Sequence, residues 1–156
     1  MLVSAWGQDT GAAEAGAIYL YNAPVTSGTS TSSADAVVYG AETNDRIGSS
    51  GSSMSTGDSN GDGETDLLVS TYASNAIGND SGQAWLLYGP LSGTYDLATD
   101  FDAAFQGSEA NDWFGFSSTL ASDLDDDGLD DIVIGAPVAD ERGYTDYGAI
   151  YVFYGQ

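Results

Sequence analysis

The chain has 156 residues and a formal charge of −22, from 24 acidic residues against two basic ones, and it contains neither His nor Cys. So acidic a chain is unsuited to nucleic acid or to anionic lipid, because both attract proteins through Lys and Arg. The absence of His and Cys excludes histidine bases, cysteine nucleophiles, the usual zinc sites and disulfides.

Short apolar runs separated by Gly, Ser, Asn and Asp predict an all-β chain, because no stretch has the 3.6-residue periodicity of an amphipathic helix. In chain order, we expect strands near residues 2–5, 17–21, 36–39, 48–55, 67–71, 84–88, 103–106, 116–121, 132–135 and 149–154. Several of these runs are apolar on both faces, so both faces need a cover. Stacked four-stranded blades provide it, whereas a β-sandwich, the alternative, covers one face of each strand.

The first acidic loop, residues 58–66, carries oxygen-bearing side chains at alternate positions before a glycine. Oxygen ligands at positions 1, 3 and 5 of a tight loop converge on one hard cation, the glycine at position 6 permits the turn, and position 7 offers a backbone carbonyl. A further carboxylate at position 9 closes the loop where the next strand begins. The expected ligands are Asp58, Asn60, Asp62, Glu64 and Asp66.

The second acidic loop, residues 123–131, repeats this spacing, with Asp123, Asp125, Asp127, Leu129 and Asp131 as the expected ligands. An apolar residue at position 7 fits a ligand provided by the main chain. Both loops lack the bidentate Glu that an EF-hand has at position 12, and a β-run follows each loop in place of a helix. We therefore expect one Ca²⁺ in each loop, and we expect both loops to be of a kind other than the EF-hand. A solvated Asp/Asn/Gly turn is the other interpretation, and the second copy disfavours it.

An internal repeat organises the chain. The segments GAIYLYN, GQAWLLYG and GAIYVFYG begin at Gly16, Gly82 and Gly148, which are 66 residues apart both times. The repeat predicts about two and a half four-stranded blades of a β-propeller whose ring is incomplete. We expect one propeller segment over 1–156, with a partial blade lacking its first strand (1–40), a complete blade (41–107) and a partial blade lacking its last strand (108–156).

The sequence WFGFSSTLASDLDDDGLDDIVIGAP, residues 113–137, resembles an FG-GAP repeat of the integrin α-subunit type. Residues 47–73 look like a worn second copy, with Ile47 in place of the Phe and Ser-Thr-Tyr in place of Gly-Ala-Pro. The resemblance implies a calcium-binding propeller of a secreted or surface protein. It also implies that partners bind on the face opposite the acidic loops, where Arg46, Trp113 and Arg142 are contact candidates.

These observations favour a calcium-stabilised binding or structural module with an adhesion or scaffold role. Its partners would be further blades of the same chain or neighbouring copies, and a protein or glycan ligand; we expect no nucleic-acid partner, no membrane insertion and no catalytic activity. The first alternative is a self-assembling fibre or oligomer subunit completed by neighbouring chains. The second alternative is a hydrolase that uses two carboxylates.

Overall fold

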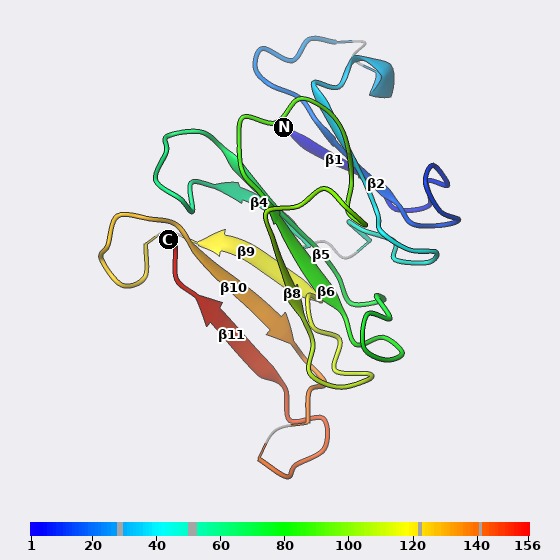
Figure 1. The fold of residues 1–156 in the computed structure, drawn as a ribbon, viewed down its shortest axis with the longest axis vertical. Helices are drawn as coiled ribbons and strands as arrows, with labels where there is room; N and C mark the ends of the chain where they lie inside the picture. The colour runs from blue at the N-terminus through cyan, green and yellow to red at the C-terminus, as the bar shows by residue number, and fades with distance from the viewer. Residues whose placement is uncertain (28–29, 50–52, 122, 141) are drawn as a thin grey trace.

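The computed structural model describes residues 1–27, 30–49, 53–121, 123–140 and 142–156. These residues form three β-sheets that lie side by side without closing a ring, together with one short 3-10 turn, η1 (Thr31–Ser33) (Figure 1). The all-β fold of incomplete propeller blades predicted from the sequence is confirmed.

The three sheets follow the repeat. The first sheet has the order β1 (Leu2–Ala5), β2 (Ala17–Leu20), β3 (Ala36–Tyr39), β7 (Gly93–Asp96). The second has the order β4 (Met54–Gly57), β5 (Asp66–Thr71), β6 (Gln83–Leu87), β8 (Ala103–Gln106). The third has the order β9 (Ser117–Ala121), β10 (Asp131–Ala136), β11 (Ala149–Phe153).

Most strands lie where the apolar runs predict them, and two differ. The strand expected at 48–55 is β4, which begins only at Met54; residues 50–52 of the expected range lie outside the described residues. Strand β7 was not predicted at all. It lies in the connection between β6 and β8, and it pairs in parallel with β3 of the preceding sheet.

Both faces of the second sheet are buried, as stacked blades require. Leu67 and Val69 of β5 pack in one apolar cluster with Ile18 of the first sheet, while Leu68 between them packs in another cluster with Ile134 of the third sheet. The hydroxyl group of Ser70 adds a polar tie, because it donates to the Gly115 carbonyl and lies 2.8 Å from the Ser118 hydroxyl. A sandwich covers strands on one face only, so that alternative is wrong.

The glycines that open the first two repeated segments, Gly16 and Gly82, have a steric reason. Gly82 has a φ of +81°, and a Cβ atom there would lie 1.9 Å from the carbonyl oxygen of Phe114. Gly16 meets the backbone of Ile47 in the same way, at 2.8 Å. A side chain at either position would therefore separate the strand from the turn that leads into the next blade.

Candidate metal centre

The second acidic loop brings three carboxylates together. Asp123, Asp125 and Asp131 each present an oxygen atom, and these atoms all lie within 4.8 Å of one another. The loop joins the end of β9 to the start of β10, so two paired strands fix its ends. An oxygen-only set of this size is the chemistry that a hard divalent cation prefers.

Backbone N–H groups hold these carboxylates in place. The Asp123 carboxylate accepts hydrogen bonds from the N–H groups of Asp127 (3.0 Å) and Gly128 (2.7 Å). The Asp131 carboxylate, which is fully buried, accepts from Leu124 (2.6 Å) and Gly155 (3.0 Å). The fold itself therefore positions the Asp123 and Asp131 side chains.

Electrostatics at this loop favour a positive charge. Desolvation, together with the negative charges of Asp127, Asp131 and Asp123, raises the pKa of Asp125 above its ordinary value. Carboxylates this close repel one another unless a cation lies between them. Asp127, the remaining side-chain ligand predicted here, is outside the group of three, and its carboxylate accepts from the Leu129 N–H (2.9 Å).

The first acidic loop has the same framework with less charge. The Asp58 carboxylate accepts from the N–H groups of Gly61 (2.8 Å) and Gly63 (3.0 Å), and the buried Asp66 carboxylate accepts from the Ser59 N–H (2.8 Å). Within residues 58–66, all of which the structure describes, no three carboxylates converge as they do in the second loop. The reason is that an amide, Asn60, stands where the second loop has Asp125.

Asp66 and Asp131 have a second role that the spacing did not reveal. Asp66 accepts from the N–H of Gly89 (3.0 Å), and Asp131 accepts from the N–H of Gly155, so each joins its loop to the end of the neighbouring strand. The signal was present in the sequence, because Tyr-Gly follows the strand both times, at 88–89 and 154–155.

The two loops also contact each other. The Asp58 N–H donates to the Asp130 carboxylate and the Asp130 N–H donates to the Asp58 carbonyl, both at 2.9 Å. The side chain of Leu129 packs against the first loop, since a Cβ atom at Gly61 would lie 2.6 Å from its Cδ2. These contacts between blades were not foreseen, and they join the two candidate sites into one end of the molecule.

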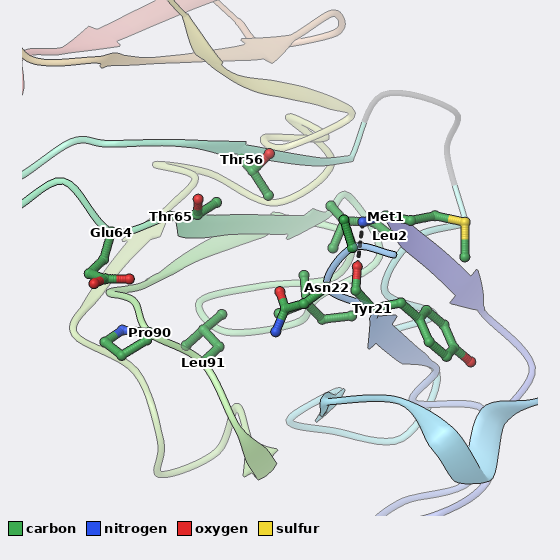
Figure 2. Close-up of a pocket in the computed structure, with 11 residues that line it drawn as sticks. Met1, Leu2, Tyr21, Asn22, Thr56, Glu64, Thr65, Pro90 and Leu91 are labelled. Carbon is green, nitrogen blue, oxygen red and sulfur yellow. Dashed lines mark hydrogen bonds between the residues drawn. The ribbon is translucent and has the colours of Figure 1, made fainter. Parts of the chain in front are cut away.

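Glu64, predicted to offer its backbone carbonyl, also lines a cavity of about 430 Å³ between the first two sheets. Figure 2 shows it on one side of this cavity, with Met1 and Tyr21 on the other. The Met1 amino group donates to the Tyr21 carbonyl (2.7 Å) there. A carboxylate therefore borders the cavity next to the first loop.

Two of the three contact candidates, Arg46 and Trp113, have local partners. Arg46 pairs with Glu14 through its Nε (2.9 Å) and Nη2 atoms. Trp113 lies 5.4 Å from the Tyr72 ring and stacks on Phe116 at 6.0 Å. Both residues have positive φ angles, +51° and +56°, so each also shapes the turn that it occupies. Their role in binding a partner stays a prediction, as does that of Arg142.

The repeated blades, the second and third of which have an acidic loop that leads into the second strand, define a module of β-propeller blades. The FG-GAP repeat model matches residues 50–87 and 114–153, which together make up half of the chain. The chain belongs to the FG-GAP repeat family.

Curated relatives of the chain include proteins named phosphatidylinositol-glycan-specific phospholipase D. The chain is 32% identical to the mouse protein (Mus musculus) over 105 residues, 65% of this chain and 12% of the relative. It is 31% identical to the human protein (Homo sapiens) over 110 residues, 67% of this chain and 13% of the relative. The match thus spans only about an eighth of those relatives. Among the described residues, no helix has the length and apolar character needed to cross a bilayer.

Proposed function

We propose that this chain is a calcium-stabilised, non-catalytic binding or structural module of a secreted or surface protein, with an adhesion or scaffold role. The observation that carries the proposal is the convergence of Asp123, Asp125 and Asp131 at the start of a buried strand. Calcium accepts the many protein oxygen ligands that the loops offer, whereas magnesium keeps most of its water.

Each loop holds one Ca²⁺ in this proposal, and the second binds more tightly. The second loop carries six carboxylates within residues 123–131, whereas the first carries four within 58–66. Affinity rises with the ligand charge count, and extracellular modules work at dissociation constants of about 0.1–1 mM. An extracellular location, where calcium is plentiful, therefore suits the module.

A non-catalytic role is supported by the side chains that the loops provide. In this proposal each carboxylate in the group of three is a ligand of the ion, and His is absent from the whole sequence. The phospholipase D name of the relatives describes proteins of which this chain matches about an eighth, so we do not extend their activity to it.

Self-assembly is the second candidate, and the outer face of the third sheet favours it. Ile150 is 76% exposed and Val152 is 44% exposed, although the equivalent residues of the second sheet, Ala84 and Leu86, are buried. An apolar face of this kind favours a covering polypeptide. Further blades or neighbouring copies of the chain would bury it, and light scattering over a range of concentrations would detect association.

Calorimetric titration of the metal-free chain with CaCl₂ tests the main proposal. We expect two sites, of which Asp127→Ala removes the second and keeps the first. Binding to the folded state alone adds about 2.7 kcal/mol per site at a hundredfold excess over Kd, so chelation should lower the melting temperature by roughly 5–11 °C per site. NaCl added without calcium should restore only part of this loss, because screening reduces repulsion without providing ligands.

Melting that EDTA leaves unchanged would contradict the proposal, as would a variant Asp127→Ala that still binds two ions. Magnesium is the control, and it should bind at least about tenfold more weakly than calcium.

A further inference from the structure

The first two sheets are joined by a strand that crosses between them. Strand β7, from the β6–β8 connection of the second blade, pairs in parallel with the outer edge of β3 in the first. The N–H of Gly93 donates to the Asp35 carbonyl (2.9 Å), and the N–H of Leu97 donates to the Tyr39 carbonyl (3.0 Å). The first sheet thus has one strand, β7, beyond β3, which is the last strand of its own blade.

Two leucines that flank β7 fill the space between these blades. Leu91 is 6% exposed and Leu97 is 1% exposed. They bury their side chains in one apolar cluster with residues from both blades, including Ala36, Val38 and Leu87. β7 therefore contributes a ladder of hydrogen bonds together with two apolar anchors, six residues apart.

Strand β8 is the equivalent of β3 in the second blade. β3 follows Asp35, whose carboxylate accepts from the N–H of Asn22 (2.7 Å), and β8 follows Asp102, whose carboxylate accepts from the N–H of Tyr88 (2.7 Å). Both strands pair antiparallel with the preceding strand of their own blade.

The outer edge of β8 is open. The N–H of Gly107 donates to the Gly82 carbonyl on the β6 side (3.1 Å). Because hydrogen-bonding directions alternate along a strand, the N–H groups of Ala104 and Gln106 point to the opposite edge. Among the residues that the structure describes, no strand pairs with that edge.

A cavity of about 380 Å³ lies beside this edge. Its position corresponds to the place that Leu91 and Leu97 fill in the preceding pair of blades. Its walls include Leu86, Ala103, Phe105, Ile132 and Phe153. By the registers of the paired strands, these five correspond to residues that surround the two leucines: Leu20, Ala36, Val38, Leu67 and Leu87. Phe105 and Phe153 remain partly exposed, whereas Val38 and Leu87 are buried.

We propose that the outer edge of β8 and the adjoining cavity form an acceptor site for an extended peptide segment. The segment pairs in parallel with β8 and inserts two apolar side chains, six residues apart, into the cavity. Its chemistry is that of residues 91–97, LSGTYDL, because this segment occupies the equivalent place on β3. Main-chain hydrogen bonds then provide affinity, and the two anchors provide specificity. The site requires no bound cation.

A synthetic, end-capped peptide of residues 89–99 tests the proposal. It is added to the ¹⁵N-labelled 156-residue chain, and amide chemical shifts are followed. We expect saturable shifts of Ala104, Gln106 and the β11 amides. A matched peptide with Leu91→Asp and Leu97→Asp should bind about tenfold more weakly or worse, because both apolar anchors are lost.

Protein variants locate the binding edge. Ala104→Pro removes an outward N–H at an edge position where proline is tolerated, and it should abolish the shifts. Ala104→Val keeps the N–H and should retain them. The proposal is overturned if millimolar peptide produces no shift, if the aspartate peptide binds equally well, or if the shifts are confined to β1–β3. If Ala104→Pro does not fold, the comparison of the two peptides alone decides.

Discussion

Replacing Asp131 with alanine separates the structural role of the acidic loop from its role in metal binding. The Asp131 carboxylate is fully buried and accepts hydrogen bonds from the N–H groups of Leu124 and Gly155. Both hydrogen bonds are partly buried, and a hydrogen bond to a charged group contributes about 1.5–3 kcal/mol. The variant should therefore lose roughly 3–6 kcal/mol of unfolding free energy even in excess EDTA, out of the 5–15 kcal/mol usual for a domain.

Urea denaturation in EDTA and again in millimolar CaCl₂ measures this loss, with Asp125→Ala as the matched control. Asp125 is exposed, and it belongs to the same group of three carboxylates. Asp125→Ala should match the wild-type chain in EDTA, or exceed it because a like charge is removed, and should lose stability only relative to the calcium-bound chain. If Asp131→Ala is as stable as the wild type in EDTA, the hydrogen bonds to Leu124 and Gly155 do not support the loop and the reasoning fails.

Two further predictions concern positions outside the acidic loops. Burial is the largest cause that raises the pKa of Asp45, to about 6. The hydrogen bond that its carboxylate accepts from the N–H of Glu42 opposes this shift. The folded state thus binds the Asp45 proton more tightly than the unfolded state does. Protonation of Asp45 therefore contributes about 3 kcal/mol to the unfolding free energy; this contribution is full below about pH 4 and is lost as the pH rises through 6. Asp45→Asn should accordingly exceed the wild type in stability at pH 7.5 and match it near pH 4 in urea titrations; an advantage that does not depend on pH would argue against burial as the cause. Gly82→Ala places a Cβ atom 1.9 Å from the Phe114 carbonyl oxygen, whereas a Cβ atom at Gly93, with nearly the same φ, meets nothing within 4 Å. Gly93→Ala should cost only the dihedral strain of about 1–2 kcal/mol, and equal losses in thermal melts of the two variants would refute the close-approach argument for Gly82.

The sequence predicted the strands that carry their own apolar pattern. β5 and β10 read as apolar on both faces, and the structure buries both faces of β5 between neighbouring blades. β7 could not be predicted, because Gly-Thr-Tyr-Asp has no such pattern and is extended through its pairing with β3, a strand of another blade. Strand propensity depends on the neighbouring strand, and the order of residues along the chain does not reveal which strand that is.

The acidic loops show the same division between local and non-local information. The alternate spacing of Asp123 and Asp125 is local, and in the structure their oxygen atoms lie close together. The hydrogen bonds between Asp58 and Asp130 depend on how two blades stack, and the spacing says nothing about stacking. The repeat indicated that blades are neighbours, but it did not specify which backbone groups meet.

The acidic loops lie where strand ends and neighbouring blades meet, so calcium binding there would affect more of the structure than the loops themselves. Asp131 connects the second loop to the end of β11 through Gly155, and Asp130 connects the same loop to Asp58 in the preceding blade. An ion that fixed Asp123, Asp125 and Asp131 would thus restrain the ends of paired strands and the contact between two blades together. Chelation should loosen blade packing as well as the loop, because the residues that would hold the ion adjoin those that join the blades.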